Sequence, residues 1–228
     1  MTIYKNITDM ITEEYNQSRA DMLRHIENDE NILKKNLTPA RLKRYEEGKI
    51  TRDEAVKLAF NRARKLWDNY EDEKLKEIKE AAEAPEVVCV SISVEWHRSR
   101  LWGYNPAAEV IIVDSDGHYS KYFGSASGCG YDKESSAVAK ALNQSAPIKK
   151  MLCDKKEKSI REGKTYGANS TMNKNYISYD AGYGSVPYFE GGVGMGSHKR
   201  IFEACGLKLK NSNHGKHFDT YYFEREEV

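Results

Sequence analysis

The spacing of hydrophobic positions changes once along the chain, close to residue 86. Before that point, apolar residues recur every three or four positions on a densely charged background, which is the pattern of amphipathic helices. After it, apolar and polar positions alternate from Val88 to Trp96, as in a strand with one buried face. We therefore expect a helical segment over residues 1–86 and an α+β domain over residues 87–228.

Three helices are expected in the first segment. A long amphipathic helix comes first, and Thr38-Pro39 then has the form of an N-cap and first-turn proline of a short helix ending at Gly48. Thr51 and Glu54 have the spacing of a capping box ahead of a helix that continues to about Ala84. This long-helix hairpin could pack on the rest of the chain, self-associate, or dock onto another protein. The first helix is indicated by Ile3, Ile7, Met10, Ile11, Tyr15, Met22 and Ile26.

The second segment predicts a three-stranded antiparallel meander, helices and a C-terminal β-hairpin. Gly103–Pro106 has the composition of a turn, and Ser115–Gly117 closes the next hairpin. Helices are expected over 133–143, from 147 onward, and over 197–204. The last two strands are expected over 207–210 and 217–223.

Residues 163–196 differ from the rest in composition. These 34 residues contain 8 of the 16 glycines and 5 of the 15 tyrosines. A Gly/Tyr-rich loop or irregular hairpin of this length is expected to be functional or mobile.

The formal charge excludes two classes of function. Lys and Arg total 36 against 35 Asp and Glu, a net charge of +1, with −2 in residues 1–86 and +3 in the remainder. This balance argues against an acidic mimic of DNA and against a histone-like basic coat. Nucleic-acid contact, if present, would depend on a local patch.

The cysteines and the N-terminus indicate a reducing compartment. Cys89, Cys129, Cys153 and Cys205 form no C-x-x-C pair, and no apolar stretch approaches the length of a signal core or membrane helix. We expect a cytoplasmic protein without a membrane partner, cofactor or metal.

The segment Gly124–Ser135 is a glycine-rich link between a strand and a helix. It could be a structural turn, or a backbone site for an anion at the helix start. Cys129 could alternatively be a nucleophile, with His97 or His118 as its base.

Two further segments combine cations with aromatic rings or glycines. Arg98 and Arg100 lie among the aromatic residues Trp96, Trp102 and Tyr104, which suits an interaction surface or a capped strand edge. In Gly191–Arg200, Ser197 is the expected N-cap. His198, Lys199 and Arg200 would then lie in a first helical turn, where cations oppose the helix dipole unless an anion binds. His214-x-x-His217, with His198 or Cys205, would be a low-specificity zinc arrangement.

Several of these segments resemble a family of small proteins carried by bacterial phages and other mobile elements. The similarity lies in Trp102–Pro106 and Gly124–Ser136, and again in Gly192–His198 and Gly215–Tyr221. It covers residues 87–223, and the family includes candidate anti-CRISPR proteins.

The resemblance implies a non-enzymatic counter-defence protein of the host cytoplasm. Such a protein would bind a CRISPR nuclease effector or another defence protein, or the DNA or RNA that the effector holds, with the helices giving reach or a homodimer. The alternatives are a nucleic-acid-binding protein of mobile-element origin and a thiol enzyme using Cys129. The expected contact residues are Arg98, Arg100, Trp102, Tyr104, Cys129, Tyr131, Lys199 and Arg200.

Overall fold

The chain forms two compact units in a computed structural model that describes residues 3–99, 103–128, 131–161, 177–178 and 187–226. The helical unit comprises Asn6–Ile78. The α/β unit comprises Lys79–Val228 together with Met1–Lys5. Each unit has a hydrophobic core of its own.

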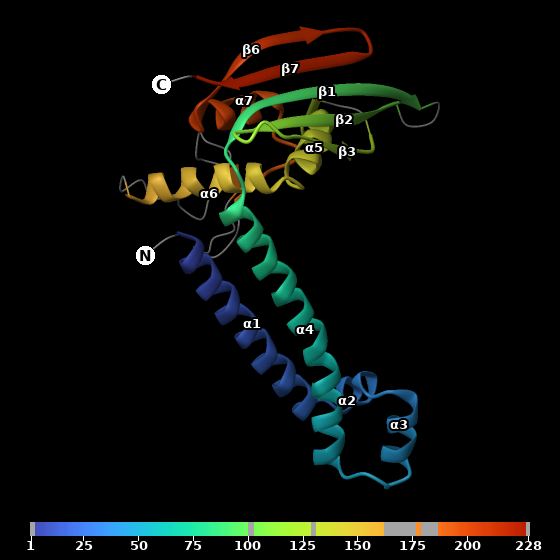
Figure 1. The fold of residues 1–228 in the computed structure, drawn as a ribbon. Coiled ribbons are helices and arrows are strands. Elements are labelled where there is room, and N and C mark those ends of the chain that lie inside the picture. The colour runs from blue at the N-terminus through green and yellow to red at the C-terminus, as the bar shows by residue number, and fades with distance from the viewer. Residues whose placement is uncertain (1–2, 100–102, 129–130, 162–176, 179–186, 227–228) are drawn as a thin grey trace. The chain divides into compact units, whose positions relative to one another are not determined.

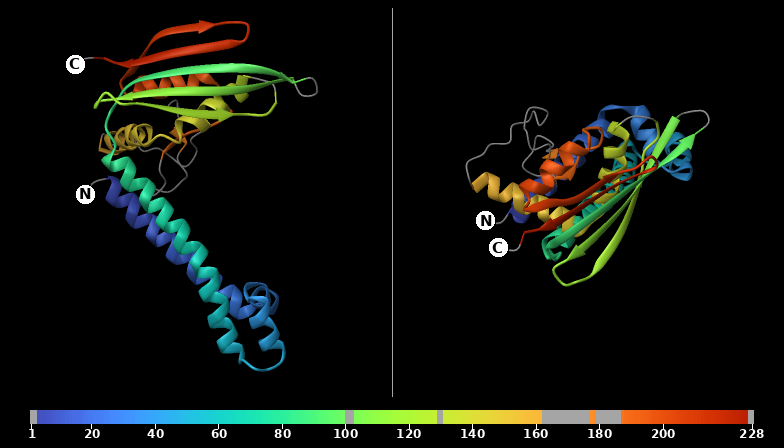
Figure 2. Two further views of the ribbon diagram at one scale, coloured as in Figure 1. Left: turned by 45° about the vertical axis from the view of Figure 1, so that its right-hand side comes forward. Right: turned by 90° about the horizontal axis from the view of Figure 1, so that it is seen from above.

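The helical unit is built on the predicted long-helix hairpin. Figures 1 and 2 show α1 and α4 side by side, joined through two short helices. The bounds are α1 Ile3–Asn28, α2 Glu30–Asn36, α3 Pro39–Glu46 and α4 Arg52–Glu83.

Side-chain caps set where three of these helices begin. Asp29 interrupts the expected first helix, because its carboxylate accepts hydrogen bonds from the amides of Asn31 and Ile32 and so starts α2. Thr38 caps α3 as predicted. The capping box is also confirmed: the Thr51 amide lies 2.8 Å from Glu54 Oε2, and the Glu54 amide lies 3.2 Å from Thr51 Oγ1.

The two long helices contact each other through rings and one arginine. Tyr15 and Trp67 meet edge to face with ring centroids 6.1 Å apart. Arg19 donates to Asp68 over 2.9 Å and also pairs with Glu71. Toward α2 and α3, the core of this unit consists of Ile26, Leu33, Leu37, Ile50, Ala55, Val56, Ala59 and Ala63.

The α/β unit contains one five-stranded antiparallel sheet, in the order β3-β2-β1-β7-β6. The predicted α+β class, meander and C-terminal hairpin are confirmed, and β1 joins the meander to the hairpin by pairing with both β2 and β7. The strands are β1 Val87–Ser99, β2 Gly103–Asp114, β3 Tyr119–Ser125, β6 Leu207–His214 and β7 Phe218–Arg225. The helices are α5 Tyr131–Leu142, α6 Ala146–Arg161 and α7 Met195–Ala204, and a separate two-stranded sheet pairs β4 Ile177–Ser178 with β5 Tyr188–Phe189.

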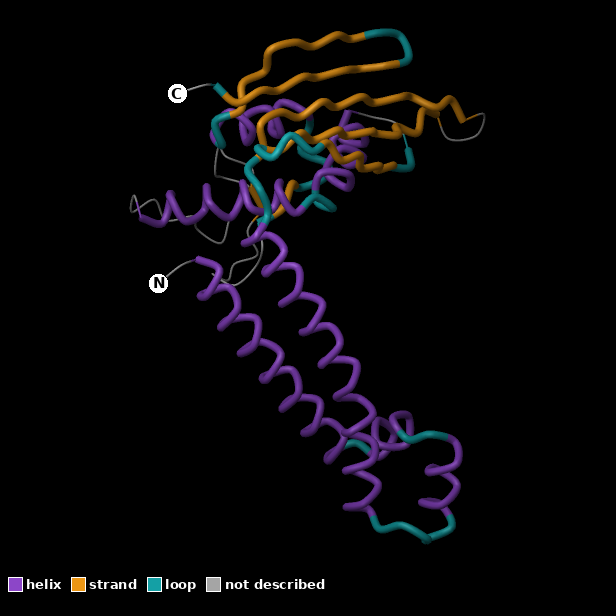
Figure 3. Tube along the Cα trace, viewed as in Figure 1, coloured by secondary structure: helices purple, strands orange, loops and turns teal. Residues whose placement is uncertain are grey.

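All three helices of this unit lie on one face of the sheet, which we call the inner face (Figures 1, 2 and 3). Strand alternation explains the arrangement, because Val90, Ile92 and Val94 point inward and are fully buried. Phe202 of α7 packs against Phe223 of β7 with ring centroids 4.5 Å apart. The hydrophobic core of the unit therefore lies between the sheet and its helices.

One glycine allows α5 to approach the sheet closely. A Cβ on Gly124 of β3 would lie 2.0 Å from the backbone oxygen of Ala137 and 2.8 Å from the amide nitrogen of Ala141. Any side chain at this position would displace α5 from β3.

The expected turn at Gly103–Pro106 is wrong, because these residues begin β2. Pro106 pairs with Trp96, whose amide is bonded instead to the His217 carbonyl on the β7 side. The Trp96–Pro106 pair is therefore a non-hydrogen-bonded one, and proline's missing N–H costs the β1–β2 ladder nothing. The last described pair of this ladder is Ser99 with Gly103, and the residues between them lie outside the described residues.

The Gly/Tyr-rich stretch 163–196 lies largely outside the described residues. Its described part includes β4, β5 and the start of α7, which begins at Met195 with Gly194 as N-cap. The prediction that Ser197 is the N-cap is therefore wrong, and the Ser197 hydroxyl donates back to the Val193 carbonyl over 2.9 Å. Within the described residues, no helix has the length and apolar character needed to cross a membrane.

Candidate functional site

The predicted contact residues divide into those that the structure describes and those that it does not. Arg100, Trp102 and Cys129 lie outside the described residues. Arg98 and Tyr104 are paired backbone positions of β1 and β2, and Tyr131 is the first residue of α5; the side chains of these three lie outside the description. Lys199 and Arg200 are described in full.

Lys199 and Arg200 follow the first turn of α7, because that helix starts two residues earlier than expected. The expectation that they oppose the helix dipole in the first turn is therefore wrong, since the effect is confined to that turn. Arg200 is exposed, and its Nη2 lies 3.4 Å from Ser197 Oγ. Lys199 extends its ammonium to 4.7 Å from the ring centroid of Tyr221.

The fold brings the two glycine-rich segments together at the start of α5. Ser135 Oγ accepts hydrogen bonds from the amides of Gly192 and Gly194, over 3.2 and 3.1 Å. A Cβ on Gly191 would lie 3.0 Å from Ser136 Oγ. Sequence reasoning treated these motifs separately, because nothing local indicates a contact between residues almost 60 positions apart.

A buried carboxyl group lies beside this junction. Glu134 is 3 % exposed and accepts a hydrogen bond from the Tyr221 hydroxyl over 2.8 Å. Burial raises the pKa of Glu134, and the Tyr221 bond opposes that shift only in part. Burial and the Glu134 charge raise the pKa of Tyr221 in turn.

His214 and Asp219 lie beside Tyr221 and complete this group of side chains. We call it the Glu134 cluster, which consists of Glu134, Lys199, His214, Asp219 and Tyr221. His214 Nδ1 lies 3.2 Å from Asp219 Oδ1, and its ring meets Tyr221 edge to face at 5.4 Å. The Asp219 charge adds to the raised pKa of Glu134, while His214 and Lys199 lower it. The cluster ties α5 and α7 to the terminal hairpin through polar contacts.

His198 of α7 is a buried neutral base. Its Nε2 lies 3.0 Å from the Glu190 carbonyl, which assigns the proton to Nε2, and burial lowers the pKa of His198 to about 4. Phe189 meets the ring edge to face at 5.2 Å. His198 is therefore a core residue, which sequence reasoning placed instead in an anion-binding turn.

The zinc arrangement suggested by His214-x-x-His217 does not form within the part of the chain that the structure describes. There, one group of three ligand-type side chains lies within 4.8 Å: Asp114, Asp116 and His118. Asp114 Oδ1 accepts the amides of the other two over 3.0 Å, so this group is accounted for by the β2–β3 turn.

The outer face of the sheet, opposite the helices, carries exposed aromatic side chains. Register places them on this face, because they pair through β1 and β2 with outward positions such as Ser91 and Glu95. The exposed fractions are 69 % for Tyr119, 61 % for Phe123, 51 % for Phe218 and 36 % for Tyr222. We call these four residues the aromatic frame.

Serines and larger residues of β1 and β2 lie between the rings of the frame. Its two sides lie on β3 and β7, separated by three interstrand steps or about 14 Å, and the two rings on each strand are about 13 Å apart. Ser91, Ser93 and Ile111 lie between them. A hydrogen bond with Cys89 raises the pKa of Tyr222.

The two lysines that register places on the outer face are both paired with carboxylates. Lys121 lies 3.3 Å from Glu109 across β2 and β3, and Lys208 pairs with Glu226. Both lysines are thus engaged by carboxylates. The charged residues that register places outward are Glu95, Glu109, Lys121, Lys208 and Glu224.

Sequence reasoning missed the aromatic frame, although a signal was present. Strand alternation identifies the buried face, and positions of the opposite parity are expected to face solvent. Tyr119 and Phe123 share the parity of Lys121, which marks aromatic residues on the solvent side of a strand.

The α/β unit is a two-layer α+β fold, an open antiparallel sheet covered by helices on one face. Comparisons of the chain with models of protein families, with curated proteins and with solved structures give no match.

Proposed function

We propose that this protein is a non-enzymatic binding protein whose aromatic frame binds a partner protein. The observation that supports it is the exposure of four aromatic rings on one open sheet face. Aromatic residues are enriched in the energetic centres of protein interfaces, and exposed apolar patches on soluble domains commonly mark such sites. The open sheet face between the rings suits a partner surface better than a small molecule.

The charge of the face favours a protein over a nucleic acid. Phosphates require unpaired cations, but the lysines of the outer face already pair with Glu109 and Glu226. Three carboxylates against two lysines would further repel a nucleic-acid backbone. A partner with apolar side chains and mixed charge complements this surface.

We further propose that the partner is a CRISPR nuclease effector and that binding inhibits it. The support is the resemblance of Trp102–Pro106 and Gly124–Ser136 to the mobile-element family that includes candidate anti-CRISPR proteins. Host cytoplasm is the matching compartment. The segment Gly124–Ser136, which carries part of this resemblance, begins one residue after Phe123 and therefore adjoins the aromatic frame.

Two of the three described cysteines, Cys153 and Cys205, are poorly suited to act as thiolates. Cys153 is fully buried, and burial raises the pKa of Cys205 to about 12. A thiol with a raised pKa is a poor nucleophile at neutral pH. Iodoacetamide labelling of Cys129 at neutral pH tests the remaining thiol hypothesis, because rapid labelling would support the enzyme.

The direct test combines a binding assay with a cleavage assay. Purified CRISPR effectors of several types are mixed with the protein, with the Phe123→Ala/Phe218→Ala double variant, and with Tyr70→Ala as a control aromatic of the helical unit that is 54 % exposed. The wild type and the control should bind and inhibit, and the double variant should bind at least about 30-fold more weakly. Equal binding by all three proteins would show that the aromatic frame is not the binding surface. No binding by the wild type would show that a CRISPR effector is not the partner.

Salt dependence separates the nucleic-acid alternative from the protein partner. Affinity for single-stranded DNA or RNA should fall by a factor of about 10³ or more between 50 and 200 mM salt if phosphate contacts dominate. We expect weak or no binding to either nucleic acid. A tight, steeply salt-dependent complex would favour the nucleic-acid-binding protein instead.

Self-association through the helices is tested separately. Leu66 is 61 % exposed and Tyr70 54 % exposed, one helical turn apart on α4. If the helices form a homodimer, Leu66→Glu should convert it to a monomer in sedimentation velocity, while Phe123→Ala should not.

A further inference from the structure

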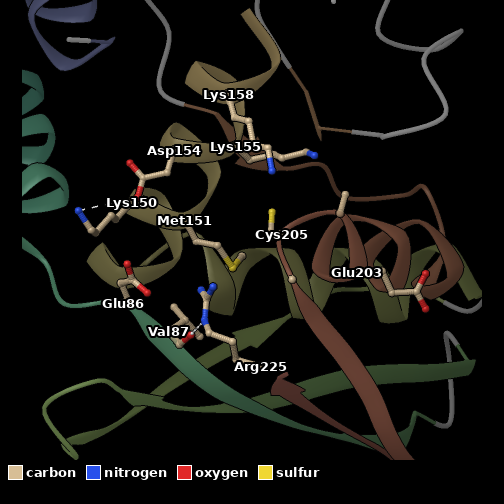
Figure 4. A pocket seen from close by; sticks show the side chains of 12 residues that line it. Glu86, Val87, Lys150, Met151, Asp154, Lys155, Lys158, Glu203, Cys205 and Arg225 are labelled. Atoms are coloured by element: carbon tan, nitrogen blue, oxygen red, sulfur yellow. Dashed lines mark hydrogen bonds and ion pairs between the residues drawn. The ribbon is translucent and has the colours of Figure 1, made fainter. Parts of the chain in front are cut away.

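A cavity of about 420 Å³ lies in the α/β unit between α6, the C-terminal end of α7, and the ends of β1 and β7. Figure 4 shows its lining, with Met151 and Cys205 forming an apolar interior and charged side chains around it. Its volume is within the range of about 300–1,000 Å³ that small-molecule sites occupy. The cavity is distinct from the outer face, so what it binds is independent of the proposed partner.

The charged residues of this cavity leave an excess of cations. Four cations and three carboxylates line it, a difference of +1. Lys150 lies 3.8 Å from Asp154, so these two neutralise each other. The other two carboxylates, Glu86 and Glu203, are solvent-exposed, and Figure 4 shows the Glu203 carboxylate directed away from the other charged groups.

Three cations remain: Lys155, Lys158 and Arg225. No ion pair joins them to a carboxylate among the described side chains. Lys155 and Arg225 both act on the Cys205 thiol, since their charges oppose the increase in its pKa that burial causes. Cations of α6 and β7 therefore converge on the interior of the cavity near Cys205.

The arginine is held in place by the sheet. Arg225 Nε donates to the Val87 carbonyl over 2.9 Å, which fixes the guanidinium plane and leaves its terminal nitrogens for another acceptor. Gly206, with φ of +85°, lies beside it, because a Cβ there would be 3.7 Å from Arg225 Nη1. The Cys205 thiol is neutral at physiological pH, since burial raises its pKa to about 12, so it adds no negative charge.

We propose that this cavity binds the phosphate group of a small phosphomonoester. With Lys150 paired to Asp154 and the Glu203 carboxylate directed away, three cations and the exposed Glu86 leave two positive charges, which match a phosphate dianion better than a single carboxylate. A fixed guanidinium provides parallel donors suited to phosphate oxygens, and the two lysines supply flexible charge. The apolar walls leave room for a sugar-sized group.

The sequence contains a signal for this site in the run of basic residues within α6. Lys150, Asp154 and Lys158 are spaced by four, and Lys155 lies on the same side of the helix. On their own these residues look like a solvated helix face. The C-terminal end of β7, which brings Arg225, makes them one side of a cavity.

The test is titration calorimetry of the full chain at low ionic strength, using inorganic phosphate and ribose 5-phosphate as probes. The variants are Lys155→Gln and Lys158→Gln, with Lys210→Gln as a control, because Lys210 is an exposed lysine of β6 outside the cavity lining. We expect both probes to bind, each cavity variant to weaken binding about tenfold, and the control to match the wild type. Tighter binding of ribose 5-phosphate would assign the natural ligand to sugar phosphates rather than free phosphate.

Two results would overturn this proposal. One is the absence of heat of binding for either probe up to about 10 mM, a concentration at which even millimolar sites are occupied. The other is equal weakening by Lys155→Gln and Lys210→Gln, which would indicate nonspecific charge attraction. Urea unfolding without ligand is measured in parallel. If the cavity variants lose stability and the wild type binds no phosphate, the lysines serve only to complement the negative C-terminal end of the α7 helix dipole.

Discussion

The two faces of the five-stranded sheet use aromatic residues in opposite ways. On the inner face, Phe202 and Phe223 are fully buried and stacked 4.5 Å apart. On the outer face, Phe123 and Phe218 are more than half exposed. Burial accounts for the first pair, because each ring removes apolar surface from water. Burial does not explain the exposed pair on the outer face. The contrast therefore separates aromatic residues that stabilise the fold from aromatic residues that are available for binding.

The largest effect on stability should come from the inner face. Phe202→Ala removes a ring that contacts Phe189 and Phe223, and it should destabilise the α/β unit by about 3–5 kcal/mol. Urea unfolding monitored by circular dichroism measures this loss. A change below about 1 kcal/mol would mean that the inner face is not packed as described.

The buried His198 should make the inner face acid-sensitive. Its pKa is about 4 in the folded protein against 6.5 for a free histidine, so its contribution is present above pH 6.5 and is lost as pH falls toward 4. The difference corresponds to about 3 kcal/mol of stability. His198→Gln keeps a donor for the Glu190 carbonyl but cannot titrate, so its stability should change less than that of the wild type between pH 6.5 and 4.5. Parallel pH profiles would contradict this explanation.

Glu134 should act in the opposite direction. Because burial raises its folded pKa, protonated Glu134 favours folding at low pH, and that contribution is lost as pH rises through the raised pKa. Glu134→Gln can still accept from the Tyr221 hydroxyl without ionising. The variant should therefore gain stability relative to the wild type between pH 4.5 and 7.5 in chemical unfolding. A wild type that gains more over this range would show that Glu134 is ionised and well paired.

The smallest stability effect should come from the outer face. Phe123→Ala and Phe218→Ala should each change the free energy of unfolding by about 0.5 kcal/mol or less, because their rings are exposed. If thermal unfolding shows a loss comparable to that of Phe202→Ala, the two faces do not differ as proposed. If both variants keep the stability of the wild type and lose partner binding, the difference between the two faces is clearest.

Local signals in the sequence predicted the elements of the fold better than their assembly. Thr51 and Glu54 determine a helix start through contacts three residues apart, and alternation from Val88 to Trp96 identifies β1 without reference to the rest of the chain. The pairing of Cys89–Glu95 with β7 joins residues about 130 positions apart, for which no local pattern exists.

The candidate site was predicted less well for two physical reasons. The composition of Gly103–Pro106 predicts a turn, yet these residues begin a strand, because Pro106 occupies a non-hydrogen-bonded pair of the β1–β2 ladder. Predicted cations were assigned to nearby motifs, but Lys199 contacts Tyr221 through the tertiary fold. The aromatic frame and the cavity both depend on strands far apart in sequence, so only the folded chain reveals them.

The strand order has a consequence for how this protein behaves at high concentration. A sheet that does not close has two edges able to pair with another chain, here β3 and β6. Pairing of another chain with the β6 edge is hindered by Lys208 and Lys210 and by the register irregularity between Leu209 and Asn211. The β3 edge has a regular register and one lysine of its own, Lys121, and the Phe123 and Ser125 carbonyls on this edge already accept hydrogen bonds from Gln144 and Lys140. Pairing with another chain would therefore begin at the Tyr119 end of β3, beside one ring of the aromatic frame.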